Sequence, residues 1–280
     1  CLSTASPNQR KYVILSVSNI FSLVLLSPHY EKEKTYDIVL LVISAEYEKE
    51  EREEIRRQWA SKKESMMQKM GKSVVIFLVG QSSALDEEAA QYGDLLLVDI
   101  EESYRNLVYK IEIGFRWIKE KLQSEYVAKI DSDTVVHIDR LYNLLQRYDA
   151  RSESRMWMTC YTHSGAAPMR YRYDVWYVSE SDYPQDVYPR YCNGPGYVMT
   201  RETFDEIVIE VEDVFFTGIV AEDFVTHISE GVTDEQYTDY STCDGNGPVL
   251  SILNTHYQLG WSKKSNDLTE AWERLKDPIC

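Results

Sequence analysis

The residues best suited to chemistry are the two carboxylates of Asp131-Ser132-Asp133. They directly follow the largely apolar run 126–130, whose pattern is typical of a buried strand that leaves its sheet at these aspartates. In open α/β sheets, ligands bind at the carboxyl ends of the strands. Carboxylate oxygens suit Mg²⁺ or Mn²⁺, and such an ion commonly bridges carboxylates to phosphate oxygens. The pattern therefore predicts a divalent-ion site for a nucleotide diphosphate; the alternative is a solvated turn or a helix cap.

The elements that must position this site alternate along the first half of the chain. Apolar runs predict strands over 36–44, 73–80, 94–100 and 126–130, and helices are expected over 48–70, 86–92, 106–122 and 138–148. This alternation is typical of an α/β protein with a doubly wound, mostly parallel sheet. The sequence has no Gly-x-Gly-x-x-Gly after its first strand, no Walker A sequence and no Gly-x-Ser-x-Gly elbow, so it lacks the fingerprints of those site classes.

The second half of the chain has a different character. Short strands are expected over 156–161, 171–178 and 197–200, joined by loops rich in Pro, Gly, Ser and Asp. Tyrosine is dense between 171 and 191, as in many sugar sites, although core packing is the alternative. Because no clean linker, repeat or low-complexity tract occurs, we predict one domain over 36–280, divided into halves at 36–150 and 151–280.

Charge and composition exclude several classes of protein. The net charge is −16, which argues against nucleic-acid binding, because that usually needs a basic face. The hydrophobic content of 44% is normal for a globular core. The five cysteines include no Cys-x-x-Cys pair and histidine is sparse, which argues against structural zinc. Spread-out cysteines fit either reduced core thiols or a few disulfides in a secretory compartment.

Residues 1–35 are interpreted as an N-terminal segment. The first residue is Cys rather than Met, so we interpret the chain as a fragment. The apolar run 12–27 is shorter than the ~20 residues of a membrane helix, and serines interrupt it. We therefore expect a strand or entry helix that covers the domain, and the alternative is the remnant of a membrane anchor or stem.

Four patterns occur in a fixed order along the chain. They are Arg52-x-x-Ile55-Arg56-x-x-Trp59, Asp131-Ser132-Asp133, the run from Tyr188-Pro189 through Tyr191-Cys192 to Gly194-Pro195-Gly196-Tyr197, and Glu212-Asp213-Val214. Together they resemble the β1,3-galactosyltransferase/β1,3-N-acetylglucosaminyltransferase family, the fringe-related inverting glycosyltransferases. That family shows R-x-x-I-R-x-T-W, D-D-D or D-x-D, Y-P-x-Y-C-x-G-x-G-Y and E-D-V. The resemblance covers residues 37–280.

The resemblance implies a GT-A type fold, with a Rossmann-like, mostly parallel sheet flanked by helices and a mixed half on the acceptor side. It also implies a UDP-sugar donor, held by residues 36–150, and Mn²⁺ as cofactor. Asp133 would ligate the metal together with His256, which stands in a late L-x-x-x-H-like segment. His227 and His137 are the alternatives, and His137 is expected to help start the next helix.

Asp213 matches the family's general base. An inverting transfer needs the acceptor hydroxyl deprotonated as it attacks the anomeric carbon, and a carboxylate in reach of that proton contributes roughly 10²–10⁴-fold. Glu212 is the first alternative base, and Glu222 and Asp223 are more distant ones. Judged from the residues alone, Glu212-Asp213 also fits a loop cap.

Several residues are candidates for binding the donor. Arg52, Arg56 and Lys129 would contact the diphosphate or balance local charge, since Arg suits phosphate geometry. The alternative is a set of helix-surface salt bridges with nearby glutamates, which are Glu51, Glu53 and Glu54. Asp131, Gly194 and Gly196 complete the predicted donor set.

The chain departs from the family pattern at four positions. Ser132 stands at the centre of the Asp motif, where the outer aspartates remain. Pro195 replaces a residue with an N–H, which puts the identity of the donor sugar in doubt. Gln58 and Val108 each replace a threonine.

The resemblance implies an enzyme that moves galactose or N-acetylhexosamine from UDP to a glycan hydroxyl, with a β1,3 linkage. It implies a Golgi membrane protein of type II with a luminal domain, which touches the membrane only through an N-terminal anchor. In that compartment, Cys160 would pair with Cys192 and Cys243 with Cys280. The rival functions are a non-catalytic sugar-binding relative and a metal-dependent UDP-sugar hydrolase or nucleotidyltransferase.

Overall fold

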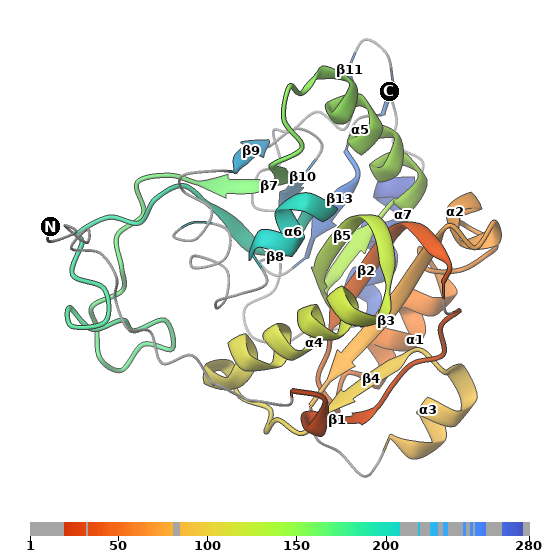
Figure 1. The fold of residues 1–280 in the computed structure, drawn as a ribbon, viewed down its shortest axis with the longest axis horizontal. Helices are drawn as coiled ribbons and strands as arrows, with labels where there is room; N and C mark the ends of the chain where they lie inside the picture. The colour runs from red at the N-terminus through yellow and green to blue at the C-terminus, as the bar shows by residue number, and fades with distance from the viewer. Residues whose placement is uncertain are drawn as a thin grey trace, which may run out of the picture.

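A large sheet forms the centre of the computed structural model (Figure 1), which describes residues 20–31, 33–80, 85–207, 218, 225–228, 232–234, 243–244, 247–248, 250–255 and 265–276. The sheet has the order β1-β4-β3-β2-β5-β8-β7-β9. Its strands are β1 (Val24–Leu26), β2 (Thr35–Ile43), β3 (Ser73–Val79), β4 (Leu95–Val98), β5 (Gln123–Asp131), β7 (Trp157–His163), β8 (Tyr191–Thr200) and β9 (Thr226–Ile228). The strands β4, β3, β2 and β5 run parallel, whereas β8 is antiparallel to both of its neighbours.

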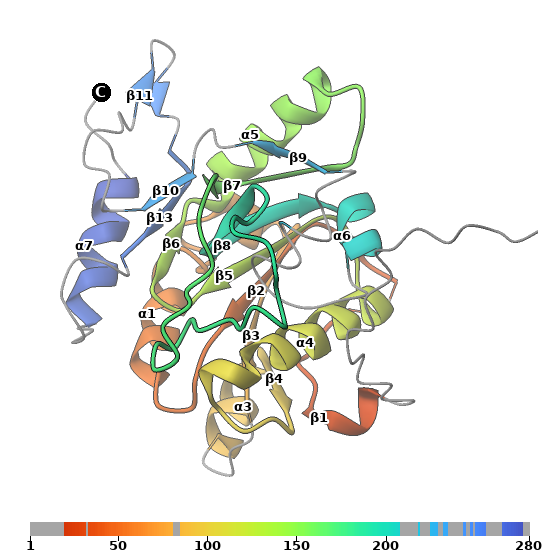
Figure 2. The same cartoon turned by 90° about the vertical axis from the view of Figure 1, so that its left-hand side faces the viewer.

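Helices cover both faces of this sheet (Figure 2). One face packs against α1 (Lys49–Arg57), α2 (Met66–Lys69), α3 (Asp86–Tyr92), α5 (Ile138–Arg151) and α7 (Ser265–Lys276). The other face packs against α4 (Leu107–Lys121) and α6 (Arg201–Ile207). The predicted fold class, a mostly parallel sheet flanked by helices, is confirmed.

Smaller elements complete the described fold. A second sheet has the order β10-β13-β6, in which β6 is Thr134–Val136, β10 is Val232–Asp234 and β13 is Ile252–Asn254. A short ladder joins β11 (Cys243–Asp244) to β12 (Gly247–Pro248). Two 3₁₀ helices, η1 (Ile20–Leu23) and η2 (Tyr104–Asn106), precede β1 and α4.

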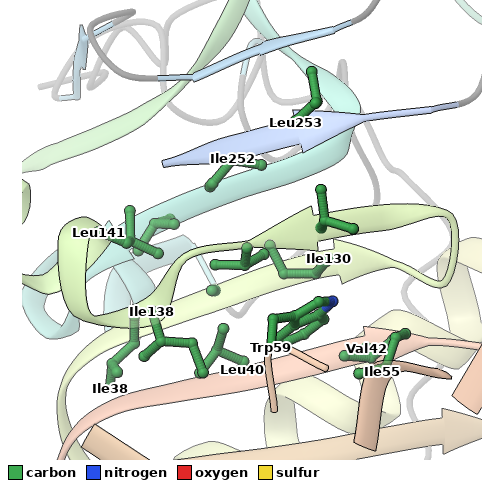
Figure 3. Packing of buried hydrophobic residues seen from close by; sticks show 14 of the residues in the cluster. Ile38, Leu40, Val42, Ile55, Trp59, Ile130, Ile138, Leu141, Ile252 and Leu253 are labelled. Carbon is green, nitrogen blue, oxygen red and sulfur yellow. The ribbon is translucent and has the colours of Figure 1, made fainter. Parts of the chain in front are cut away.

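The continuous apolar sequence of β2 follows from its central place in the sheet. Successive side chains of a strand point to opposite faces, so Ile38, Leu40 and Val42 enter one core and Val39 and Leu41 enter the other. The first of these cores also contains Ile55 of α1 and Trp59, which follows that helix, as Figure 3 shows. Both faces must therefore be apolar, as in other buried parallel strands.

The helix predicted over 48–70 is wrong as a single element, because the structure has two helices there. At Gln58 the backbone leaves helical geometry, with ψ at −114°, and the side chain donates to Thr269 of α7 at 2.9 Å. The second helix begins at Ser65, where the carboxylate of Asp139 accepts the N–H groups of Met66 and Met67. The hydroxyl of Ser65, which accepts the N–H of Gln68, and a partner on α5 thus set the helix start together.

The strand predicted over 171–178 is also wrong. The segment forms turns and makes only an isolated bridge between Met169 and Tyr177. The carboxylate of Asp174 accepts the N–H of Trp176 at 2.9 Å, which favours a turn. The guanidinium of Arg170 donates to the carbonyls of residues 178, 183 and 185 at 2.7 to 3.0 Å, and so organises the long connection between β7 and β8.

The described part of the N-terminal segment joins the main sheet. β1 pairs antiparallel with β4, so residues 24–26 of the run 12–27, for which a strand or an entry helix is expected, form a strand, and residues 12–19 lie outside the described residues. Among the residues that the structure describes, no helix is both long and apolar enough to cross a membrane. The division of the chain at residue 36 remains a prediction.

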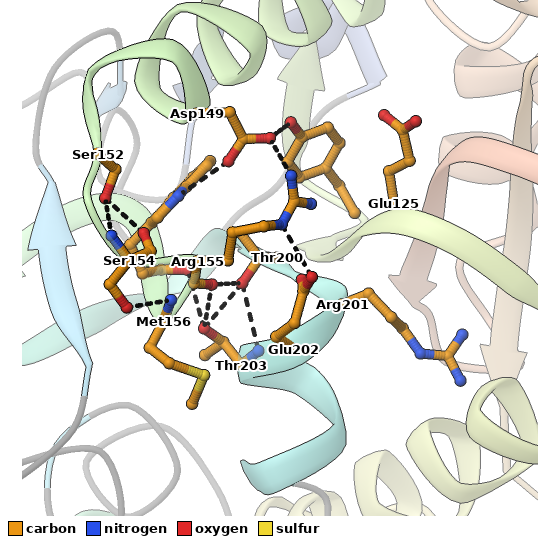
Figure 4. A network of polar contacts seen from close by, with 12 residues as sticks. Glu125, Asp149, Ser152, Ser154, Arg155, Met156, Thr200, Arg201, Glu202 and Thr203 are labelled. Carbon is orange, nitrogen blue, oxygen red and sulfur yellow. Dashed lines mark hydrogen bonds and ion pairs between the residues drawn. The ribbon is translucent and has the colours of Figure 1, made fainter.

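A polar cluster connects the ends of several elements (Figure 4). The carboxylate of Asp149 accepts the hydroxyl of Tyr126 and the indole N–H of Trp157, the latter at 3.1 Å. Arg155 pairs with both Asp149 and Glu202, at 2.8 and 2.9 Å. Burial, followed by the bond to Asp149, raises the pKa of Tyr126. The cluster ties α5 to β5, β7 and the start of α6.

A disulfide joins β7 to β8. Cys160 and Cys192 are bonded, with their Cα atoms 5.5 Å apart, which confirms one pairing that the family resemblance implied. The other pairing involves Cys280, which lies outside the described residues.

Buried ion pairs fasten α1 to α3. Arg52 is fully buried and donates to both carboxylate oxygens of Glu88, at 2.8 and 2.7 Å. Arg56 donates to Glu88 at 2.8 Å and to Asp94 at 2.7 and 2.8 Å. Burial alone would raise the pKa of Glu88, but the bonds and charges of the two arginines outweigh it and hold that pKa below its ordinary value of 4.5.

We expect Glu88→Gln to lower the free energy of unfolding at neutral pH by about 3 kcal/mol, because it leaves the fully buried guanidinium of Arg52 without its carboxylate and removes one of the two carboxylates that Arg56 contacts. Since the folded pKa of Glu88 is lowered, its carboxylate stabilises the fold above the ordinary pKa, and this contribution disappears as the pH falls through the lowered value. The variant therefore loses less stability on acidification than the wild type. Urea unfolding between about pH 7 and about pH 3 measures both effects.

The matched control is Glu53→Gln, on the same helix. The side chain of Glu53 is half exposed and lies 4.0 Å from Lys49, so its loss is expected to change the free energy of unfolding by less than about 0.5 kcal/mol. Equal effects of the two substitutions contradict the stabilising role of the buried pairs.

Replacing both bonded cysteines, Cys160→Ser with Cys192→Ser, is expected to lower the free energy of unfolding by about 2–4 kcal/mol, because the unfolded chain loses a cross-link. Urea unfolding of the double variant measures this change. If Cys160 and Cys192 are both alkylated in wild-type protein that is unfolded without a reductant, the disulfide is contradicted.

Candidate functional site

The predicted carboxylates lie where β5 ends. Asp131 is the last residue of the strand and pairs with Ile43, the last residue of the parallel strand β2. Ser132 and Asp133 form the turn that leads into β6. Because β2, β3, β4 and β5 are parallel, their carboxyl ends share one edge of the sheet, which is the usual position of ligand sites in such sheets.

Asp133 is 5% exposed and is held by the residue after β13. Its carbonyl accepts the N–H of Thr255 at 3.1 Å and the hydroxyl of the same residue at 2.6 Å. This contact exists because β13 pairs antiparallel with β6, with Asn254 opposite Thr134. The predicted metal ligand His256 follows Thr255 directly in the sequence and lies outside the described residues.

Lys129 links the acidic turn to β8. The side chain is 1% exposed, and its ammonium donates to Asp131 Oδ1 at 2.8 Å and to the carbonyl of Gly194 at 2.7 Å. Lys129, which is predicted to bind the donor, thus connects Asp131 and Gly194, which are also predicted to bind it.

The Gly-Pro-Gly segment lies in a bulge of β8. Between the pairs Thr162–Cys192 and Cys160–Tyr197, β7 has one residue while β8 has the segment 193–196. Bulges often occur beside functional sites, and they tolerate proline. A Cβ at Gly196 would lie 3.3 Å from Ile252, so this glycine permits close packing of β8 against β13.

Glu48 lies against the acidic turn, and sequence reasoning missed it. One of its carboxylate oxygens accepts the hydroxyl of Ser132 and the N–H of Ala45, both at 2.8 Å. The N–H of Ser132 donates to the carbonyl of Ile43 at 3.1 Å. Glu48 and Ser132 stand far apart in the sequence, so no local pattern could reveal their contact.

Buried cations hold the loop that follows β2. Arg52 donates to Ser44 Oγ at 2.9 Å and to the carbonyl of Ala45 at 2.6 Å. Lys110 donates to the carbonyl of Ser44 and to Glu102, each at 2.7 Å, and burial lowers its pKa although Glu102 opposes the shift. Lys110 and Glu102 are further residues that the sequence did not indicate.

The alternative assignment of the two arginines needs a correction. The sequence alternative is a set of salt bridges to nearby glutamates of the same helix. In the structure, Arg52 pairs with Glu88 on α3, and Arg56 pairs with Glu88 and Asp94. Those partners lie on α3 and just after it, so they follow from tertiary packing. Donor contact by either arginine remains a prediction.

The remaining candidates are distributed as follows. His137 begins α5, where its ring accepts the N–H of Arg140 at 3.3 Å, as expected. His227 lies on β9 at the sheet edge, opposite Met158. Within the described ranges, no three His, Cys, Asp or Glu side chains are grouped as metal ligands. The predicted base Asp213 and its alternatives Glu212, Glu222 and Asp223 lie outside those ranges.

Gly218 lies beside the first residue of β8. Gly218, which follows the Glu-Asp-Val pattern, packs so closely that a Cβ there would lie 2.9 Å from Tyr191 Cβ. Asp213 stands five residues before Gly218 in the sequence, and its position stays a prediction.

Comparisons with known proteins bear on the identity of this arrangement. A family model described as galactosyltransferase matches residues 50–230. Human β-1,3-galactosyltransferase 5 is 32% identical over an alignment of 194 residues that covers 64% of this chain and 60% of that protein. Human β-1,3-galactosyltransferase 2 is 28% identical over an alignment of 276 residues that covers 91% of this chain and 62% of that protein. The chain thus spans about three fifths of the length of these relatives.

Solved structures are more distant. S. aureus TarS is 13% identical with a TM-score of 0.41, over 86% of this chain and 64% of that one. The mannosyltransferase PcManGT from Pyrobaculum calidifontis, in complex with GDP-Man and Mn²⁺, is 15% identical with a TM-score of 0.39, over 75% and 59%. These TM-scores are low, so the assignment rests on the sequence matches. The match to more than half of the chain, together with the ordered patterns, shows that this chain belongs to the β1,3-galactosyltransferase family.

Proposed function

We propose that this chain is the catalytic part of an inverting glycosyltransferase. It moves galactose or N-acetylhexosamine from a UDP-sugar to a glycan hydroxyl and forms a β1,3 linkage. Family membership supports transfer of a hexose. The observation that carries the proposal is the bond of Thr255 to Asp133, which brings the segment leading to His256 against the acidic turn.

The residues of the turn fit a hard divalent ion such as Mn²⁺. Asp131 and Asp133 offer carboxylate oxygens at the ligand-binding edge of the sheet, and such oxygens suit this class of metal. Asp133 and His256 would hold the ion. When bound, it neutralises the charge that develops on the departing diphosphate.

Asp213 is proposed as the general base. Its carboxylate takes the proton of the acceptor hydroxyl while that oxygen bonds to the anomeric carbon on the face opposite UDP. The bond between the anomeric carbon and the diphosphate oxygen breaks, and UDP leaves with the electron pair. The packing of Gly218 against Tyr191 supports this role, because Gly218 follows the Glu-Asp-Val pattern in the sequence and lies beside the strand that carries the Gly-Pro-Gly bulge.

Acceptor specificity is proposed to lie in the tyrosine-rich connection between β7 and β8. Tyr171, Tyr173 and Trp176 are 64%, 76% and 54% exposed there. Aromatic rings of this kind offer apolar faces together with polar atoms at their tips. Both properties suit the faces and hydroxyls of a sugar.

We also propose a type II protein of the Golgi membrane whose catalytic part is luminal. The disulfide between Cys160 and Cys192 supports an oxidising compartment. The relatives with which the chain shares its family support a glycan acceptor.

We expect Asp213→Asn to lower acceptor-stimulated UDP release by roughly 10²–10⁴-fold while binding of UDP with Mn²⁺ is retained, because only proton removal is lost. The measurement is UDP release from UDP-Gal, UDP-GlcNAc, UDP-GalNAc and UDP-Glc, with and without mixed glycan acceptors. UDP release at the same rate with and without acceptors indicates a hydrolase. No release with any donor, from folded protein, indicates a non-catalytic relative.

Asp133→Asn and His256→Ala are each expected to raise the Mn²⁺ concentration needed for half-maximal UDP binding by at least about tenfold, because each removes a metal ligand. Calorimetric titration of UDP at several Mn²⁺ concentrations measures this. His137→Asn is the matched control, since Asn also caps helices and keeps the bond that starts α5. Weakening by the control but not by His256→Ala reassigns the second ligand to His137.

A further inference from the structure

We propose that Glu48 and Ser132 act as a positioning pair, which fixes the acidic turn against the loop after β2 and on which metal-dependent binding of a nucleoside diphosphate depends. The inference rests on the proposed function, because it takes the turn from Asp131 to Asp133 as the metal and diphosphate site. Neither residue of the pair needs to touch the ligand.

The pair joins two strand ends that already lie side by side. Ile43 and Asp131 are the last paired residues of β2 and β5. One residue beyond, the N–H of Ser132 still donates to the carbonyl of Ile43. Beyond Ile43 and Asp131, the carboxylate of Glu48 connects the two segments, because it accepts the hydroxyl of Ser132 and the N–H of Ala45. The side chain thus extends the connection between the strands where the backbone ladder ends.

Both members of the pair are buried, so the contact is strong and specific. Glu48 is 7% exposed and Ser132 is 3% exposed. A hydrogen bond to a charged group is strengthened by a low local dielectric, and an unmatched buried charge is costly. The ammonium of Lys110 also interacts with Glu48 and Asp131, so one buried cation balances the carboxylates on both sides of the contact.

This geometry explains the serine at the centre of the aspartate motif. A carboxylate at position 132 would meet the carboxylate of Glu48 at the place where the hydroxyl of Ser132 now donates at 2.8 Å. Two carboxylates at that distance repel, because neither offers the donor that the hydroxyl of Ser132 supplies. Ser132 supplies the missing donor, so the two residues are matched to each other.

The pair acts on ligand binding through the residues on either side of it. Asp131 and Asp133 flank Ser132, so an anchor at the centre of the turn fixes both carboxylates. Residues that orient metal ligands commonly change metal affinity by about 10–100-fold when they are replaced. The same anchor fixes the loop from Ser44 to Glu48 at the ligand-binding edge of the sheet, and therefore couples that loop to the turn.

The test adds a charge at position 132 of the full chain and then removes the facing charge at position 48. Ser132→Asp is expected to weaken Mn²⁺-dependent UDP binding by at least about tenfold. Adding Glu48→Gln is expected to restore binding to within about threefold of wild type, because it removes one of the two like charges. Glu53→Gln in the same background is the control and restores nothing. Calorimetry with Mn²⁺ or with a chelator measures binding, and the thermal midpoint reports folding.

A second variant covers the case in which Ser132→Asp does not fold. Ser132→Ala removes only the hydroxyl and is expected to weaken Mn²⁺-dependent UDP binding by about tenfold, with UDP binding in chelator unchanged. The inference is overturned if folded Ser132→Asp or Ser132→Ala binds like wild type, or if Glu48→Gln rescues no better than Glu53→Gln. Wild type that binds UDP equally with and without Mn²⁺ overturns the proposed function itself, and this result is seen before any variant is compared.

Discussion

The parallel pairing of β2 with β5 is the interaction on which the candidate site depends. The ladder runs from Thr35 opposite Gln123 to Ile43 opposite Asp131, so both strands end at the same level. Their side chains fill the cores on the two faces of the sheet, which holds this register, because a slip of one residue would exchange the faces. The loop after β2 and the acidic turn lie together only in this register.

The polar residues at that edge follow from the same pairing. The ends of strands that are buried on both faces have little access to water, so charged side chains there must be paired. Lys110 with Glu102, Lys129 with Asp131 and Arg52 with Glu88 meet this requirement. In a chain with a net charge of −16, these buried cations also keep the carboxylates at the edge from repelling one another.

Sequence patterns predicted the elements that local residues determine. The apolar strands and the helix over 86–92 were expected within a few residues of their observed bounds. The errors lie where distant contacts contribute, such as the contact of Gln58 with Thr269 at the end of α1 and those of Arg170 in the turns after β7. The contact between Glu48 and Ser132 gives no local signal either. The roles of Asp213 and His256 stay predictions, since both lie outside the described residues.

The connection between β7 and β8, which extends away from the sheet in Figure 1, has a consequence for how acceptor preference can diverge. Arg170 fixes its path through backbone carbonyls, whatever side chains those residues carry. The exposed rings at Tyr171, Tyr173 and Trp176 contribute little to the core, and exposed substitutions usually change stability by less than about 0.5 kcal/mol. Evolution can therefore vary the surface offered to a glycan without disturbing the sheet edge that carries the chemistry, so specificity and catalysis can change independently within one fold.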